Sequence, residues 1–465
     1  QACLVEIKHS LKLSSPSATK DFFHTIYCLL NSLIMKKHLA FILALYISFC
    51  FNSTAQQLGI NADRLHKNLI NLSTYGKNAA GGSDRIAYSK HDVEARVYIK
   101  ELMKNAGMEV TVDFAGNIIG RKAGKNPSMK PIAFGSHIDE VPNGGDYDGP
   151  VGSLGAIEVV HTLSENGLVT AHPLEVIIFT NEEGGVVGSR AIVGALSEEA
   201  LQIKSNAGVT QAEGIKLLGG DPSRISEMKR NPADVESYLE LHIEQGGNLY
   251  NEKLDIGVVE GIVAIEWWEF SFKGKANHAG TTPMNMRKDP MLPAAKLVLA
   301  VNEIVTSFEG RQVGTVGKIQ AFPGAGNVIP GEVKVNVEVR DLSSEKIWKI
   351  YENIEQRAKA LASEGGVELA IKHIEVASKP ALADPMIREV IKNQAEKMGF
   401  TTKSLPSGAG HDAQEMARIA PMGMIFIPSK DGISHAPEEF SSKEDIANGA
   451  NILLQTILEL DRRLK

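Results

Sequence analysis

The chain has 465 residues, of which 23% are charged, and a formal net charge of −7 at neutral pH. This length and charge predict a soluble protein of enzyme size with about two domains. The sequence contains no basic patch and no nucleic-acid-binding motif, which argues against nucleic acid as a partner.

The first 55 residues are predicted to be a leader. From Met35 the sequence continues with two lysines at 36–37, an apolar stretch at 39–51 and small residues up to Ala55. This is the order of a secretory signal peptide, so we expect cleavage after Ala55 and export, to the periplasm of a bacterial cell. A membrane anchor is the alternative, because a second apolar stretch precedes Met35.

All three cysteines, Cys3, Cys28 and Cys50, fall within this leader. A mature chain that begins after it would therefore contain no thiol. Such a chain forms no disulfide, binds no zinc through cysteine and has no thiol nucleophile, which excludes the Glu-Lys-Cys route to amide hydrolysis.

The next part of the chain alternates helices and strands. Apolar spacing predicts a helix over 92–106 and then a strand over 108–113. Apolar runs at 131–134 and 174–179 have strand length, and 151–167 between them is predicted to be a crossover helix. A strand, helix, strand unit forms a parallel pair, and open α/β sheets bind ligands at the carboxyl ends of such strands. We therefore predict an α/β fold with its active site at this edge.

Residues that can bind a metal ion follow each of these two predicted strands. His137 and Asp148 follow the first strand, and Glu182 and Glu183 follow the second. Nitrogen and oxygen ligands without thiolate suit zinc, manganese or cobalt in a hydrolytic site. One glutamate would be a ligand and the other a general base. Either motif alone is equally well explained by solvated loop residues, but the two together favour a metal site.

A third strand, ending in polar residues, is predicted at 237–246, after a charged, loop-rich segment at 196–235 that we expect to form peripheral helices without catalytic residues. His242 in this strand is a candidate third ligand.

After Gly257 the pattern changes to a long strand at 262–273, a helix, paired strands, a second helix and a strand. Asp289-Pro290 is a suitable cap for the first helix, through Phe308. The second helix is predicted from one apolar stripe and ends at Gly365-Gly366; its stripe is Ile347, Ile350, Tyr351, Ile354, Ala358 and Leu361. Two helices on one face of an antiparallel sheet form a compact α+β domain. We place it at 257–374, inserted into a domain made of 56–256 and 375–465.

The α/β pattern resumes after this insertion. It includes a polar loop at 407–412, an apolar strand at 422–427 and a loop containing His435. The closing helix is predicted to start at Ser441 or Ser442, with an acidic residue three positions later that completes a capping box.

Together these segments resemble the hydantoinase/carbamoylase group of dinuclear-metal amidohydrolases, which is related to zinc aminoacylases and carboxypeptidases. The group includes N-carbamoyl-L-amino-acid hydrolases, metal-dependent β-ureidopropionases and allantoate amidohydrolases. The resemblance extends from about Asn61 to the C-terminus and rests on seven segments in order: GSHIDEVPNGGDYDG, NEEGG, ELHIEQG, NHAGTTPM, GNVIPG, SGAGHDAQ and GISHAPEE. It implies a mostly parallel catalytic domain and a ferredoxin-like lid domain through which homodimers form.

The resemblance also implies roles for individual residues. Two divalent ions, zinc or else manganese or cobalt, would be bound with Asp148 as the bridge; the implied ligands are His137, Asp148, Glu183, His242 and His435. Glu182 would be the general base, and Asp139 the carboxylate that orients an imidazole. The implied substrate-binding residues are Gln245, His278, Asn327, Arg340 and His411, and His278 would also stabilise the oxyanion.

The spacing of the lid strand at 333–340 supports one of these roles. Its valines share one face, so Arg340 is expected on the polar face, free to bind a substrate carboxylate through two parallel hydrogen bonds. Taken singly, Arg340 would be interpreted as a surface charge and His278 as a structural histidine.

Two departures from the family pattern are visible. Glu140 replaces the usual threonine, which adds a negative charge next to the site, and the segment 184–190 differs from many relatives.

The resemblance implies hydrolysis of the carbamoyl amide bond of an N-carbamoyl amino acid or related ureido acid. The products would be ammonia, carbon dioxide and the amino acid. The alternatives are an allantoate or ureidoglycolate amidohydrolase, or an aminoacylase or peptidase of the same superfamily. A different hypothesis is a binding protein that has the hydrolase fold but no activity. Such a protein should have lost the general base or a metal ligand, whereas this sequence retains the base and all five ligand positions.

Overall fold

The computed structural model describes residues 20–22, 24–31, 34–35, 58–232, 234–374 and 379–464. The chain divides into two compact units, Gln1–Leu58 and Gly59–Lys465, and the described residues before 58 are helical. The apolar stretch of the predicted signal peptide and its cleavage site lie outside the described residues. Among the residues described, no helix is both long enough and apolar enough to cross a membrane.

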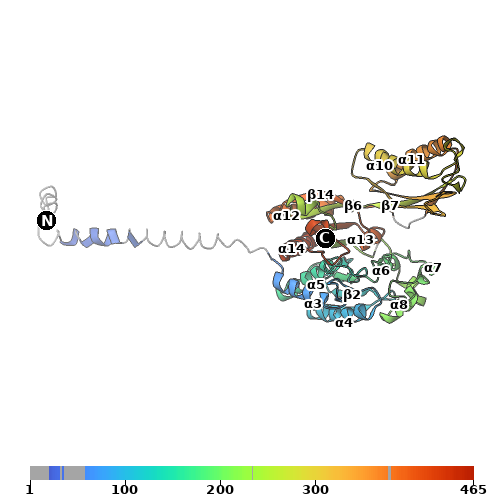
Figure 1. The fold of residues 1–465 in the computed structure, drawn as a ribbon. Coiled ribbons are helices and arrows are strands. Elements are labelled where there is room, and N and C mark those ends of the chain that lie inside the picture. The colour runs from blue at the N-terminus through green and yellow to red at the C-terminus, as the bar shows by residue number, and fades with distance from the viewer. Residues whose placement is uncertain are drawn as a thin grey trace, which may run out of the picture. The chain divides into compact units, whose positions relative to one another are not determined.

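A nine-stranded sheet forms the centre of the second unit (Figure 1). Its strands are β1 Glu109–Val112, β2 Ile118–Lys122, β3 Ile132–Ser136, β4 Leu174–Ile178, β5 Ser237–Ile243, β6 Ile256–Ile262, β13 Ala381–Leu382, β14 Thr402–Ser407 and β15 Met422–Ile427. The spatial order is β1-β2-β4-β3-β5-β15-β6-β13, with β14 beside β6. Because β4, β3, β5 and β15 are parallel neighbours, their carboxyl ends lie at the same edge.

Helices cover this sheet. They are α3 Ala62–Ser73, α4 Lys90–Asn105, α5 Pro150–Glu165, α12 Pro385–Lys397 and α14 Lys443–Arg463. Helix α5 is buried along most of its length, because it packs against β3, β4 and β5 and also against α3 and α14. The shorter elements include α6 and α13, which are mostly buried; they are α6 Val187–Ile192, α7 Glu198–Leu201, α8 Gln211–Leu217, η1 Pro222–Met228, α9 Asn248–Glu252, α13 Asp412–Met416 and η3 Lys430–Gly432.

The predicted parallel unit is present as β3, α5 and β4, with Phe134 opposite Val176 in the register. The predicted helix at 92–106 is α4, and the strand at 422–427 is β15. The closing helix is α14, and its N-cap Ser442 accepts a hydrogen bond from the backbone N–H of Asp445. Strand β2 was not predicted, because three of its five residues, in the sequence Ile-Ile-Gly-Arg-Lys, are polar or glycine.

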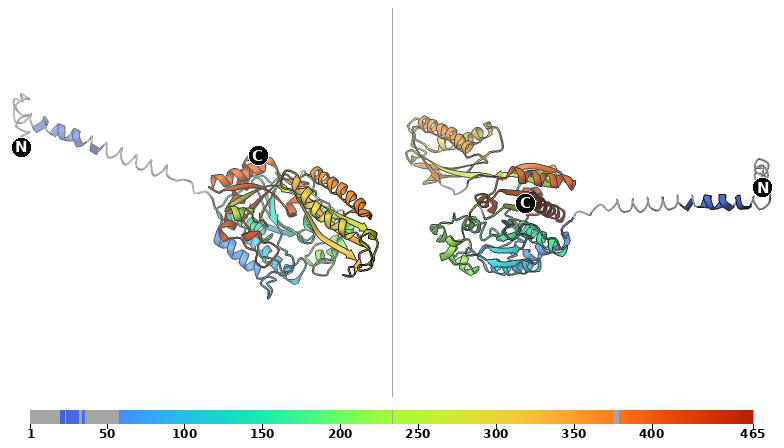
Figure 2. Two further views of the ribbon diagram at one scale, coloured as in Figure 1. Left: turned by 45° about the horizontal axis from the view of Figure 1, so that its top comes forward. Right: turned by 180° about the vertical axis from the view of Figure 1, so that it is seen from behind.

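The second sheet has the predicted antiparallel α+β architecture. Its strands are β7 Ala264–Lys273, β9 Val313–Phe322, β11 Glu332–Asp341 and β12 Glu368–Ile374, in the order β12-β7-β11-β9. All three pairings are antiparallel. Figure 2 shows helices α10 Met291–Ser307 and α11 Ser344–Gly365 side by side on one face of this sheet. The elements follow one another as strand, helix, strand, strand, helix and strand, and with this spatial order they form the ferredoxin-like fold. The predicted α/β fold with an inserted α+β lid is therefore confirmed.

The change from one sheet to the other comes later than residue 257. Residues 257–262 belong to β6, which pairs with β13, β14 and β15 in the central sheet, whereas β7 in the lid begins at Ala264. The sequence from 256 to 273 is one nearly continuous strand pattern, so it contains no turn signal that marks the change. Helix α10 likewise starts at Met291, one residue later than the predicted first position, Pro290. Asp289 Oδ1 still accepts a hydrogen bond from the backbone N–H of Met291.

The lid core yields a stability prediction. Ile354 of α11 is completely buried among the valines of β11 and the helix α10. Ile354→Ala should destabilise the protein by about 2–5 kcal/mol, because the truncated side chain leaves a cavity. The shift of the denaturant midpoint measures this cost. Glu352→Ala, at an exposed position of the same helix, is the control and should stay within about 0.5 kcal/mol of wild type. Equal stability of the two variants would contradict the packing of α11.

Candidate metal centre

Four parallel strands deliver polar residues to one edge of the central sheet. His137 follows β3, Glu182 and Glu183 follow β4, His242 is the penultimate residue of β5, and His435 lies in the loop after β15. Asp148 precedes the first turn of α5. The structure therefore brings together all five residues that the family resemblance implies as ligands, with Glu182 beside them.

Two groups of three side chains could each hold a cation: His137 with Asp148 and His242, and Asp148 with Glu183 and His435. In the first group, Asp148 Oδ1 lies 3.1 Å from His242 Nε2 and 3.7 Å from His137 Nε2. In the second, His435 Nε2 lies 3.3 Å from Asp148 Oδ2 and 3.4 Å from Glu183 Oε1. The two oxygens of Asp148 thus face different groups, which is the arrangement that a bridging carboxylate needs.

Backbone carbonyls fix the tautomers of two histidines. His137 Nδ1 lies 3.0 Å from the carbonyl oxygen of Asp139, and His242 Nδ1 lies 3.0 Å from that of Ile243. A carbonyl oxygen only accepts, so each Nδ1 carries a hydrogen, and each Nε2, which faces Asp148, is the nitrogen available to ligate a cation. This is the orientation of metal-ligating histidines.

The carboxylate of Asp139 has a different contact from the predicted one. Its Oδ1 is 3.9 Å from His137 Nδ1, farther than the residue's own carbonyl oxygen. Instead its oxygens accept hydrogen bonds from the backbone N–H groups of Glu182, at 3.3 Å, and Glu183, at 3.2 Å. Asp139 therefore orients the imidazole through its backbone and holds the two glutamates through its side chain.

The charges of the centre fit divalent cations. Burial, and then the charge of Glu183, raises the pKa of Glu182 well above its usual range. Burial and the charge of Asp148 raise the pKa of Glu183 to about 8. Glu183 Oε1 is also buried and makes no hydrogen bond within the described part of the chain. Bound cations would stabilise the ionised carboxylates and satisfy this oxygen.

Burial lowers the pKa of His137 to about 4, which leaves it neutral at pH 7, as a metal ligand must be. Burial would also lower the pKa of His242, but the adjacent Asp148 outweighs it and raises that pKa to about 9. A cation at the first position would therefore displace a proton from His242.

Backbone conformations around the centre are specialised. Gly149 has φ of +77°, and a Cβ there would lie 2.4 Å from the ring of His137. Asn181, Gln245 and His435 also have positive φ, at 50°, 55° and 56°. Such conformations are costly for residues other than glycine and persist where the surroundings enforce them, commonly at functional sites.

Gln245 contacts the centre directly. Its Nε2 donates to Asp148 Oδ2 at 2.6 Å and lies 3.5 Å from His435 Nε2. Sequence reasoning did not single out Glu439, which is buried next to these residues. Its Oε1 accepts from the backbone N–H groups of Tyr147, at 2.9 Å, and Asp148, at 3.0 Å. The only signal for it was its place in the GISHAPEE segment.

His411 is not placed for direct substrate contact. Only 1% of the residue is exposed, its ring packs edge-on against His242 at 4.5 Å, and Nε2 lies 2.7 Å from Ser407 Oγ. Glu240 completes a third group of possible ligands with His242 and His411. However, Glu240 already accepts hydrogen bonds from the side chains of Ser136 and Tyr238 and from a backbone N–H. We interpret this group as a hydrogen-bonded support behind His242.

The lid brings His278 and Asn327 together. Strand β8 Asn277–His278 pairs with β10 Val328–Ile329, and the N–H of Ala279 donates to the carbonyl of Asn327. His278 Nδ1 accepts from the N–H groups of Gly280 and Thr281, so in the neutral ring Nε2 carries the hydrogen. Within the described residues, no hydrogen bond or ion pair joins His278 or Asn327 to the five ligand candidates.

Arg340 is on the polar face of β11, as predicted, and the four valines of that strand are buried. It is not free, however. Its Nε and Nη2 donate to the two carboxylate oxygens of Glu338, at 2.7 and 3.2 Å, and Nη1 donates to the carbonyl of Gly408 at 2.7 Å. Residues two apart on a strand share a face, so Glu338 takes the place expected for a substrate carboxylate.

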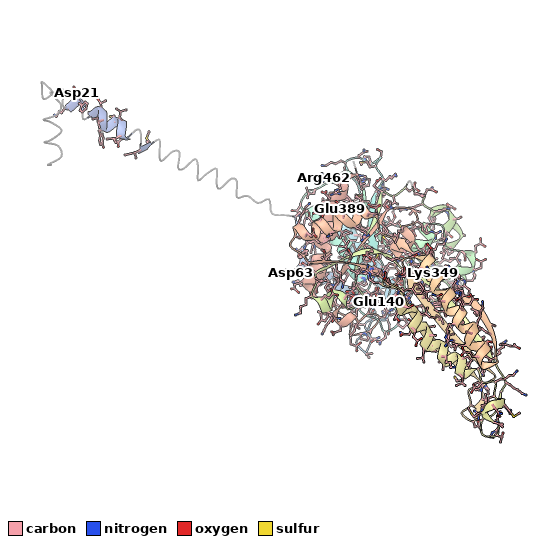
Figure 3. All side chains as sticks on the ribbon, turned by 90° about the horizontal axis from the view of Figure 1, so that it is seen from above. Asp21, Asp63, Glu140, Lys349, Glu389 and Arg462 are labelled. Carbon is pink, nitrogen blue, oxygen red and sulfur yellow. The ribbon has the colours of Figure 1, made fainter. Side chains whose placement is uncertain are left out.

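Glu140 does not add an unbalanced charge to the site. Its Oε1 accepts from Arg85 Nη2 at 2.8 Å, and both side chains are almost completely buried. Figure 3 shows Glu140 within the body of the catalytic domain. Arg85 also donates to the carbonyls of Ile138 and Leu72. The pair therefore anchors the chain next to His137. The other departure, 184–190, leads into α6, whose Val187 packs in the core.

Residues 133–459 match the sequence profile of Peptidase family M20/M25/M40. An N-carbamoyl-L-amino acid amidohydrolase of Geobacillus stearothermophilus is 41% identical over 406 residues, which cover 86% of this chain and 99% of the relative. A ureidoglycolate hydrolase of Arabidopsis thaliana is 37% identical over 418 residues, 87% of this chain and 88% of the relative. The crystal structure of a hydantoinase/carbamoylase family amidase from Burkholderia multivorans superposes with a TM-score of 0.81 at 35% identity, covering 86% of this chain and 98% of that one. The resemblance inferred from the seven segments is confirmed.

The Arg85–Glu140 pair yields a prediction. Glu140→Thr introduces the family's usual residue but leaves Arg85 buried without its carboxylate, so it should destabilise the protein by about 3–5 kcal/mol. Equilibrium denaturation measures this loss. Glu227→Thr removes a carboxylate from an exposed pair with Arg224, and it should change the denaturation midpoint very little because solvent screens such pairs. A Glu140 variant as stable as this control would show that the carbonyl partners of Arg85 suffice.

Proposed function

The chain belongs to Peptidase family M20/M25/M40, and we propose that it hydrolyses the carbamoyl amide bond of an N-carbamoyl amino acid or a related ureido acid. The observation that carries this proposal is the carboxylate of Asp148, shared by two groups of ligand candidates, with a glutamate pair beside it. The similarity to an N-carbamoyl-L-amino acid amidohydrolase over nearly its whole length supports the substrate class. The protein is thus a hydrolase of carbon–nitrogen bonds other than peptide bonds.

We propose two divalent ions per chain, zinc or else manganese or cobalt, one in each group. His137 and His242 would hold the first ion, Glu183 and His435 the second, and Asp148 both. The mixed nitrogen and oxygen donors fit these metals. The ions would supply Lewis acidity, which polarises the scissile carbonyl and makes water acidic enough to ionise near neutral pH.

Glu182 is the proposed general base. Its side chain is only 9% exposed, Oε2 lies 3.9 Å from His137 Nε2, and its backbone N–H is held by Asp139. It would take a proton from the attacking water, whose oxygen bonds to the carbamoyl carbon. It would then give that proton to the leaving nitrogen as the carbon–nitrogen bond breaks. Cleavage of one carbon–nitrogen bond of an N-carbamoyl amino acid leaves a carbamic acid, which then loses carbon dioxide, so the final products are ammonia, carbon dioxide and the amino acid.

The lid residues are the proposed substrate contacts. His278 would donate from Nε2 to the oxygen that becomes negative in the tetrahedral intermediate. Asn327 and Arg340 would bind the substrate carboxylate, and this requires Arg340 to exchange Glu338 for the substrate. Binding the acid end in this way would orient the ureido group for attack.

A ureidoglycolate or allantoate amidohydrolase is the second candidate, and the similarity to the Arabidopsis thaliana ureidoglycolate hydrolase favours it. Ammonia release from N-carbamoyl amino acids, β-ureidopropionate, allantoate and ureidoglycolate separates the two. Turnover of acyl-amino acids or peptides alone would contradict both.

We also propose a homodimer through the lid. The edge strand β9 is largely exposed, and it presents the apolar side chains of Val313, Ile319 and Phe322. An exposed edge strand is a template for pairing with another chain. Sedimentation analysis would give twice the chain mass if the proposal holds.

The proposed base gives a direct test. Glu182→Gln keeps the shape of the side chain but accepts no proton, so kcat should fall by about 10²–10⁴-fold. Since the same group also serves as the acid, we expect the upper end of this range. Metal analysis should still find two ions per chain. Turnover close to wild type would remove Glu182 from the mechanism.

The proposed substrate arginine gives another test. Arg340→Lys keeps the charge but loses the planar fork, so kcat/KM for a ureido acid should fall by about ten- to a hundredfold at unchanged metal content. The amide analogue of the substrate, which lacks the carboxylate, should be affected much less.

Arg311→Lys is the matched control, because Arg311 also joins the lid to the central-sheet domain, through Glu260 and the carbonyl of Ser404. It should preserve the preference for the carboxylate over the amide. If Arg340→Lys preserves that preference equally well, another residue binds the carboxylate.

A further inference from the structure

A single buried carboxylate connects two segments of the candidate metal centre that are far apart in the sequence. Glu439 Oε1 accepts from the N–H groups of Tyr147 and Asp148, at 2.9 and 3.0 Å. Its Oε2 accepts from Ser434 Oγ at 2.8 Å and from the N–H of His435 at 3.3 Å. Glu439 thus holds the backbone of two ligand candidates at once, one on each segment.

The surroundings leave this carboxylate little freedom. The residue is 4% exposed, and a Cβ on Gly145 would lie 2.1 Å from Glu439 Oε1, so the 144–148 turn fits around it closely. Ser434 Oγ also lies 2.9 Å from Asp148 Oδ2. The hydroxyl therefore lies between the two carboxylates, and its one hydrogen can be donated to either of them.

We propose that Glu439 is a positioning residue for the second cation, the one bound by Asp148, Glu183 and His435. It acts through the backbone of Asp148 and His435 and touches no reacting atom. This inference rests on the two cation positions of the proposed function, but not on the identity of the substrate.

The two positions differ in how their ligands are held. At the first, His242 belongs to β5 and His137 directly follows β3, and the ring of each is fixed by a backbone carbonyl. At the second, His435 lies in a loop, with positive φ and a side chain that is 48% exposed. Loss of Glu439 should therefore weaken the second position far more than the first.

Glu439→Gln tests this, because its amide has one oxygen and one NH₂ group. Whichever way the amide turns, backbone N–H groups on one of the two segments face a donor instead of an acceptor. We expect the affinity for the second cation to fall by about 10–100-fold. The first should change by less than about threefold. Titration of the metal-free protein with cobalt(II), followed by absorption and equilibrium dialysis, measures both affinities without any substrate.

Asp461→Asn is the matched control. Asp461 is a buried carboxylate of α14 that accepts from the N–H groups of Ala171 and His172, just before β4 and therefore at the opposite end of the strands from the centre. It should leave both cobalt affinities unchanged. Excess metal should restore activity to Glu439→Gln, which a general folding defect would not allow.

Unchanged cobalt binding by Glu439→Gln would overturn the proposal, as would equal weakening of both positions. If that variant does not fold, Ser434→Ala removes only the hydroxyl link and should still weaken the second position selectively; equal affinities at both positions would again overturn the proposal. A wild-type protein that binds two cobalt ions but hydrolyses no ureido acid would contradict the proposed substrate and leave the role of Glu439 intact.

Discussion

The candidate centre depends on one carboxylate that must face two directions. Asp148 directs Oδ1 toward His137 and His242 and Oδ2 toward His435, and no other residue belongs to both groups around it. Its position is fixed by the turn into α5, where Gly149 leaves room for the ring of His137. The strand order β4-β3-β5-β15 then brings the remaining ligands to the same edge. The sheet topology therefore determines which side chains meet at the candidate metal centre.

The acidic residues of this region can be sorted by what compensates their charge. Glu140 is paired with Arg85, and Asp139 is bound by the backbone N–H groups of the two glutamates. Glu439 is bound by backbone N–H groups from two segments. Glu182 and Glu183 have no such cationic partner side chain of arginine or lysine among the described residues, and burial raises the pKa of both. Their basic neighbours among the described residues are the histidines that are themselves ligand candidates, and a buried carboxylate cluster of this kind is stabilised by a bound cation.

Local pattern predicted β3, β4, β5 and β15, the crossover helix and the ligand candidates, because apolar runs end where the polar residues begin. It also predicted the buried face of β11. It did not predict that Arg340 would form an ion pair with Glu338 or that the Asp139 side chain would accept a hydrogen bond from a backbone N–H group. It also did not predict that neighbouring residues would bury His411. Each of these depends on which polar groups meet in space. Glu439 was missed for the same reason, since its partners at 147–148 are distant in the sequence.

The place of β15 governs the order in which the protein can assemble during synthesis. This strand lies between β5 and β6, although the whole lid separates it from them in the chain. The lid is one contiguous segment that can fold as soon as it leaves the ribosome. At that moment β5 and β6 still lack the strand that joins them, and His435 has not been made. The strand order therefore allows a chain with a folded lid and an incomplete central sheet, whose unpaired strand edges are surfaces prone to aggregation.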